Sequence, residues 1–146
     1  MSTPLSELSA LARKLNKKAD TLNGTIATLN AVLAKLNLGV NGWIGLKEGV
    51  PYEVDYKDSG KMMHTVTYLG FCRFERGWEI ATQVSILNED DETQSEEDAQ
   101  PLLNASRELR TLAVGEFPRL ISRMKSEAES LLANIEAAEK SVGEMS

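Results

Sequence analysis

Five side chains of this sequence could together hold an anionic ligand: Arg73, Arg76, Trp78, Arg107 and Arg110. The first three fall at the aromatic end of an expected strand, and the other two share one face of an expected helix. Guanidinium groups beside an exposed aromatic ring can stack on a nucleotide or bind a phosphate. Neighbouring glutamates offer an alternative, in which the arginines form ion pairs and their apolar stems cover a sheet edge. A small-ligand or nucleotide site at this Arg and aromatic sheet edge is therefore our second functional hypothesis.

The sequence contains few side chains that could carry out nucleophilic catalysis or bind a catalytic metal ion. His64 and Cys72 are its one imidazole and one thiol, and eight residues of an extended strand would separate them by about 26 Å. One histidine and one cysteine are too few for a structural zinc site, which usually takes four ligands. The glycine-rich stretch 39–49 matches neither the phosphate-loop nor the dinucleotide spacing. We therefore expect no catalytic residue, no metal and no cofactor, and predict that the protein is not an enzyme.

Length and composition favour a single domain over 1–146. The chain has 146 residues, of which 42% are hydrophobic and 26% are charged, a balance typical of folded proteins. No apolar run approaches the roughly 20 residues that span a bilayer, and residues 1–12 lack the pattern of a secretory signal. We expect a cytoplasmic protein with no membrane partner.

The acidity of the chain is local. The formal net charge is −6, and seven acids with no base fall within 89–98. Outside that segment, acids and bases nearly balance. Because neutralisation of phosphates dominates affinity for nucleic acids, no nucleic-acid partner is favoured. The segment 89–98 itself is typical of a solvated acidic linker.

A long helix over 4–38 is predicted by unbroken heptad spacing. One set of apolar residues, seven apart, is Leu8, Leu15, Leu22, Leu29 and Leu36. The other set is Leu5, Ala12, Ala19, Ile26 and Leu33. Such a period over more than four heptads is typical of a coiled-coil seam. Each leucine from Leu15 onward is followed by an asparagine: Asn16, Asn23, Asn30 and Asn37. We expect Gly39 to close the helix in the left-handed conformation.

The middle of the chain, 40–88, changes to a period of two. Alternating apolar residues predict three antiparallel strands joined by turns, with an additional short element at 43–46. Gly70, inside the second of these strands, is expected to mark a bulge. One face of this β-meander is apolar and needs helices to cover it.

A second helix is predicted over 99–142, with a break near 115–118 where Gly115 and Pro118 interrupt it. It carries its own heptad series, which includes Ile121, Leu131 and Ile135. The fold class is therefore α+β: a long N-terminal helix, a three-stranded antiparallel meander, and a kinked C-terminal helix that packs antiparallel to the first as a helical hairpin.

Our first functional hypothesis is a non-enzymatic interaction or scaffold protein that forms a homo-oligomer and presents its sheet and acidic linker to another protein. Two heptad stripes and one apolar sheet face give a helical hairpin a narrow core and leave the alanine-rich side of the first helix uncovered, and self-association would cover that side. The residues expected in the oligomerisation or partner seam are Leu8, Leu15, Leu22, Leu29, Leu36, Ile121, Leu131 and Ile135. The sequence leaves open whether these seams pair within one chain or between chains.

Overall fold

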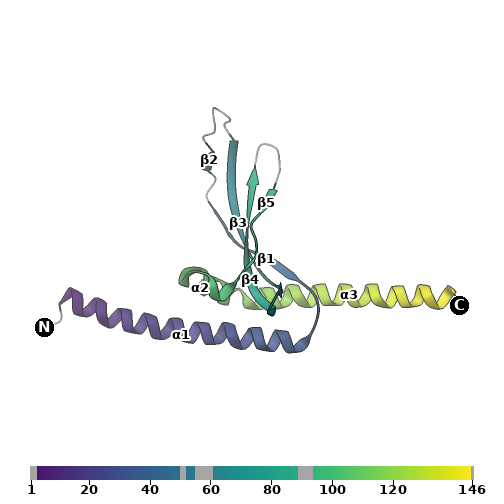
Figure 1. Ribbon diagram of the computed structural model, residues 1–146, viewed down its shortest axis with the longest axis horizontal. Coiled ribbons are helices and arrows are strands. Elements are labelled where there is room, and N and C mark those ends of the chain that lie inside the picture. The colour runs from purple at the N-terminus through teal and green to yellow at the C-terminus, as the bar shows by residue number, and fades with distance from the viewer. Residues whose placement is uncertain (1–2, 50–51, 55–60, 89–93, 146) are drawn as a thin grey trace.

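The fold is α+β, with helices at both ends and an antiparallel sheet between them, as the sequence predicts (Figure 1). The computed structural model describes residues 3–49, 52–54, 61–88 and 94–145. The N-terminal part comprises α1 (Pro4–Leu36), β1 (Gly42–Glu48), β2 (Tyr52–Val54), β3 (Lys61–Phe74) and β4 (Gly77–Asn88). The C-terminal part comprises β5 (Gln94–Glu96), β6 (Gln100–Pro101), the 3-10 turn η1 (Leu102–Asn104), α2 (Arg107–Gly115) and α3 (Phe117–Met145).

Local sequence accounts for both ends of α1. The Thr3 hydroxyl accepts a hydrogen bond from the Ser6 backbone N–H at 3.1 Å, and the Ser6 hydroxyl accepts one from the Thr3 N–H at 2.9 Å. Pro4 follows as the first helical residue, where its missing N–H costs nothing. At the other end, Asn37 takes the left-handed conformation with φ 49°. The helix therefore ends at Leu36, two residues before the expected end, and Asn37 rather than Gly39 closes it.

The sheet is larger than the predicted three-stranded meander. Its strands are ordered β1-β3-β4-β5, with β2 also paired to β3 and β6 also paired to β4. The long β3–β4 hairpin, whose register runs from Met63 opposite Asn88 to Phe74 opposite Gly77, forms its centre. β5 lies within the segment expected to be an acidic linker, because residues 94–96 pair with β4. Residues 89–93 of that segment lie outside the described part of the chain.

Gly70 does not form the expected bulge, because the β3–β4 register passes through it without a shift. It is instead the strand partner of Trp43 in β1, and a Cβ at this position would overlap the Trp43 ring. The irregularity lies in β1, where the register shifts between Gly45 and Lys47. Arg119 of α3 donates to the Gly45 carbonyl at 2.6 Å, so a side chain satisfies the backbone of this edge strand.

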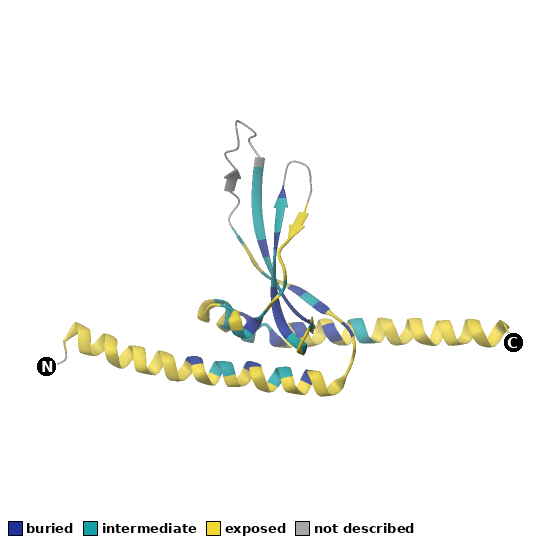
Figure 2. Ribbon diagram, in the orientation of Figure 1, coloured by how far each residue is buried: buried dark blue, intermediate teal, exposed yellow. Residues whose placement is uncertain are grey.

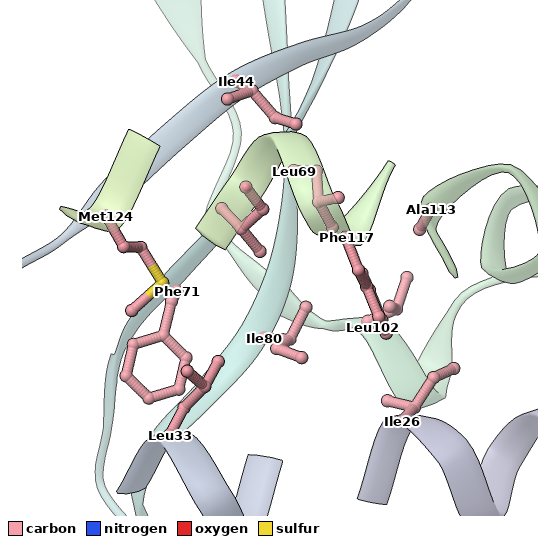
Figure 3. Packing of buried hydrophobic residues seen from close by; sticks show 11 residues of the cluster. Ile26, Leu33, Ile44, Leu69, Phe71, Ile80, Leu102, Ala113, Phe117 and Met124 are labelled. Carbon is pink, nitrogen blue, oxygen red and sulfur yellow. The ribbon is translucent and has the colours of Figure 1, made fainter. Parts of the chain in front are cut away.

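The hydrophobic core lies where the lower part of the sheet meets the helices (Figures 2 and 3). In Figure 3, Leu33 of α1 lies next to Phe71 of β3, and Ile26 of α1 points up into the same cluster below Leu102, with Ile80 of β4 between them. The other core members are Ile44, Leu69, Leu102, Ala113, Phe117, Leu120 and Met124. α1 packs against β4 and α2, while α3 packs against β1. The far part of the sheet extends away from the helices (Figure 1).

The two long helices do not form the expected antiparallel hairpin. α1 and α3 run in the same direction in Figure 1, and their outer halves project from opposite ends of the molecule. The break between α2 and α3 falls at Glu116, as expected from Gly115 and Pro118. α2 contacts both α1 and α3, and α3 then continues in the direction of α1 (Figure 1).

Candidate functional site

The most unusual surface of the molecule is formed by the outer halves of its two long helices. We call residues 4–18 of α1 the N-arm and residues 129–145 of α3 the C-arm. Both arms are exposed along their length (Figure 2). The N-arm exposes Leu5, Leu8, Leu11 and Leu15. The C-arm exposes Leu131, Leu132, Ile135, Val142 and Met145.

These apolar stripes begin inside the core and continue outward. In α1, Ile26 is fully buried, whereas Leu15 and Leu8 are 54% and 60% exposed. In α3, Leu120 is fully buried, whereas Ile135 is 46% exposed. A face that is covered on one half of a helix and uncovered on the other indicates a missing partner, because monomeric proteins rarely expose such extended apolar surface.

The predicted seam residues therefore divide into two groups. Leu22 and Leu29 are half-buried and pack against the core of their own chain. The remaining six are at least 38% exposed: Leu8, Leu15, Leu36, Ile121, Leu131 and Ile135. The sequence left open whether the seams pair within or between chains; the inner parts pack within the chain.

A shallow apolar groove of about 390 Å³ connects the end of α1 with the middle of α3. Its lining residues are Leu33, Leu36, Leu38, Ile121, Met124, Lys125, Ala128, Glu129 and Leu132. Leu36 is 58% exposed on this groove. The uncovered surface thus extends from the C-arm onto the body of the molecule.

Two residues of the asparagine ladder beside the leucines, Asn16 and Asn30, dock α1 on the rest of the chain, a role that the sequence alone did not reveal. The Asn30 Oδ1 accepts a hydrogen bond from the Ile80 N–H of β4 at 2.8 Å. Pairing of β6 with β4 stops at Ala81. At the next residue of β4, Ile80, the Asn30 side chain therefore accepts the hydrogen bond that a neighbouring strand would otherwise accept. Asn16 accepts a hydrogen bond from Arg107 of α2 at 2.8 Å. The seven-residue spacing of the ladder was the available signal.

The predicted ligand patch is largely occupied by contacts within the chain. Trp78 stacks on Phe71, with ring centroids 5.6 Å apart. Arg110 donates to the Leu103 carbonyl at 3.3 Å, and Arg107 donates to Asn16. Arg73, near the end of β3, and Arg76, in the β3–β4 turn, remain exposed.

Of the five predicted patch residues, Arg76 alone lines the hollow of about 500 Å³ beside the β3–β4 turn. Glu75 and Glu79 line the same hollow. Two carboxylates beside one guanidinium do not favour an anion. The geometry therefore gives the nucleotide hypothesis little support.

The lone thiol is placed as a core residue. Cys72 is buried in β3 opposite Glu79 of β4. Burial, and to a lesser extent the negative charge of Glu79, raise the pKa of the Cys72 thiol, which disfavours the nucleophilic thiolate. His64 lies in the same strand opposite Leu87. Among the residues that the structure describes, no group of three or more His, Cys, Asp or Glu side chains could hold a metal ion.

Comparisons with known proteins do not identify the chain: no family model matches it, and no curated protein and no solved structure gives a significant match. Within the described ranges, none of the helices combines the length and the apolar character that crossing a membrane would require.

Proposed function

We propose that the protein is a non-enzymatic scaffold that forms a homo-oligomer through the outer halves of α1 and α3. The observation that carries the proposal is the set of nine large apolar side chains exposed on the N-arm and C-arm. They occupy heptad positions or flank them, which is the pattern that pairs helices with one another.

Energetics favour a covered state of the arms. Full burial of one leucine side chain contributes about 1.5–3 kcal/mol, and the N-arm alone exposes four leucines. Isolated helices shorter than about 12–15 residues are marginal in water even for Ala-rich sequences, and the arms are only slightly longer, so each arm gains order as well as apolar cover from a partner helix. Self-association supplies that helix without requiring any second protein.

The sheet is the surface that such a scaffold would present. Its far part extends away from the helices (Figure 1), so it stays accessible when the arms are covered. Binding of an unidentified protein to this sheet and to the acidic segment remains a prediction. A cytoplasmic location also remains a prediction; the free, buried thiol of Cys72 is compatible with a reducing compartment.

Light scattering on the intact chain tests the proposal. We expect a mass of at least twice 16.0 kDa for the unaltered protein. Replacing Leu8 and Leu15 together by Asn should give the monomer mass while the sheet and core stay folded, because neither side chain belongs to the core. Leu112→Asn, on an exposed site of α2, is the matched control and should leave the oligomer intact. A single-chain mass for the unaltered protein at all concentrations would refute self-association.

A further inference from the structure

The two arms carry opposite charge. The N-arm holds four basic residues and one acidic residue, Glu7, whereas the C-arm holds four acidic residues and one basic residue, Lys140. The basic residues are Arg13, Lys14, Lys17 and Lys18, and the acidic ones are Glu129, Glu136, Glu139 and Glu144. Pairing like arms would bring like charges together, whereas pairing an N-arm with a C-arm brings opposite charges together. Charge complementarity therefore selects the unlike pair.

The apolar stripes of the two arms match when the helices run antiparallel. With Leu8 opposite Val142, each exposed position of the N-arm stripe meets an apolar position of the C-arm stripe, in four layers. The layers are Leu5 with Met145, Leu8 with Val142, Ala12 with Ala138 and Leu15 with Ile135. The next stripe position along α1 is Ala19, just beyond the N-arm, and it is already buried in its own chain. The pairing thus uses the uncovered part of the N-arm stripe and stops where the intrachain core begins.

The placement of the arms makes this antiparallel pairing reciprocal. α1 and α3 run in the same direction, and their arms project from opposite ends of the molecule (Figure 1). A two-fold axis perpendicular to the helices reverses the second copy, so that each N-arm meets the C-arm of the other copy. Parallel pairing would instead relate the copies by a shift along the helices, which leaves an unpaired arm at each end and continues into a filament.

We propose that the partner of each arm is the opposite arm of a second copy of this chain, paired antiparallel with Leu8 facing Val142, so that two such pairs close a dimer. This inference rests on the proposed self-association and specifies its geometry. Both apolar stripes and both charged arms are then used, and the dimer leaves no arm free to recruit a third copy.

Disulfide trapping tests the pairing directly. Two chains with Cys72 replaced by Ala, one carrying Leu8→Cys and the other Val142→Cys, are co-expressed with different tags and oxidised. We expect a disulfide between the two differently tagged chains, and no disulfide dimer when either chain is expressed alone, because each position then faces no second cysteine. Lys17→Cys in place of Leu8→Cys is the matched control; this residue lies away from the N-arm stripe and should not cross-link to Val142→Cys.

The outcomes separate the inference from the proposed function. A disulfide dimer of Leu8→Cys alone, or of Val142→Cys alone, would show like arms together and overturn the unlike pairing. An absent mixed disulfide, with light scattering still reporting an oligomer, would overturn the pairing while self-association stands. An absent mixed disulfide with a monomer mass would overturn both.

Charge reversal provides a second, independent readout. Lys14→Glu with Lys18→Glu should weaken the dimer on the order of tenfold in Kd at low salt, and so should Glu136→Lys with Glu139→Lys. Combining both reversals should restore the original Kd, since the arms are again opposite in charge. Glu96→Lys with Glu97→Lys, at exposed positions in and next to β5, is the control and should leave Kd unchanged. Equal Kd values for all variants would contradict the role of the arm charges.

Discussion

Replacement of Asn30 by Ala tests how α1 is held on the sheet. Asn30 accepts a hydrogen bond from the Ile80 N–H at 2.8 Å, and Ile80 is fully buried. A buried N–H left without its partner costs about 1–3 kcal/mol. Alanine recovers about 0.5 kcal/mol through its higher helix propensity. We therefore expect Asn30→Ala to lower the free energy of unfolding by roughly 0.5–2.5 kcal/mol.

Urea unfolding at fixed protein concentration measures this change, and Asn134→Ala is the matched control. Asn134 lies exposed on the C-arm, so the same substitution there gains helix propensity without removing a hydrogen bond to the sheet. The difference between the two variants isolates the contribution of the Ile80 N–H. With a slope of about 2 kcal/mol per molar urea, the loss of about 1–3 kcal/mol should place the midpoint for Asn30→Ala below that of Asn134→Ala by about 0.5–1.5 M. Equal midpoints would refute the reasoning that the asparagine ladder docks α1.

Three further predictions concern single positions. Gly70→Ala should cost about 1–3 kcal/mol of stability, because its Cβ would overlap the Trp43 ring, whereas Gly45→Ala meets no atom within 4 Å and should change the thermal midpoint little. Asn37→Gly should change the free energy of unfolding by no more than about 0.5 kcal/mol, because glycine adopts the left-handed conformation easily. Asn37→Val should lower it by roughly 1–2 kcal/mol, because a β-branched residue is strained there; urea unfolding measures both. Cys72 should react with a thiol reagent at pH 8 far more slowly in the native protein than in urea, and equal rates in both states would contradict the burial of this thiol. Because the pKa of Cys72 is raised in the folded state, the free energy of unfolding should fall as pH rises above about 8.5.

Local patterns predicted the elements well because each depends on neighbouring residues. Heptad spacing placed α1 to within two residues of its observed end, and Gly115 with Pro118 marked the break before α3. The period-two segments identified β3 and β4 for the same reason. Capping chemistry was more ambiguous, since Asn37 and Gly39 can both adopt positive φ and both do so.

The direction of α3 could not be predicted, because apolar heptad stripes pair equally well in parallel and antiparallel arrangements. The path of the chain through the sheet and α2 decides it. The prediction of a bulge at Gly70 was wrong for a related reason. A glycine within a strand is favoured both at a bulge and where an aromatic ring packs directly on the backbone. Here the ring belongs to Trp43, which is distant in sequence. The Arg and aromatic patch was predicted from residue types whose partners, such as Phe71 beneath Trp78, only the fold reveals.

Amide hydrogen exchange of the arms tests most directly whether they are covered by another copy. In a single chain, the arms are exposed helix ends that open readily, and their amides exchange almost as fast as those of a frayed helix. If the arms pair between copies, residues 5–15 and 131–142 should show protection that increases with protein concentration, while the protection of β3 and β4 stays constant. Rapid exchange of both arms at every concentration, beside a well-protected sheet, would contradict the account.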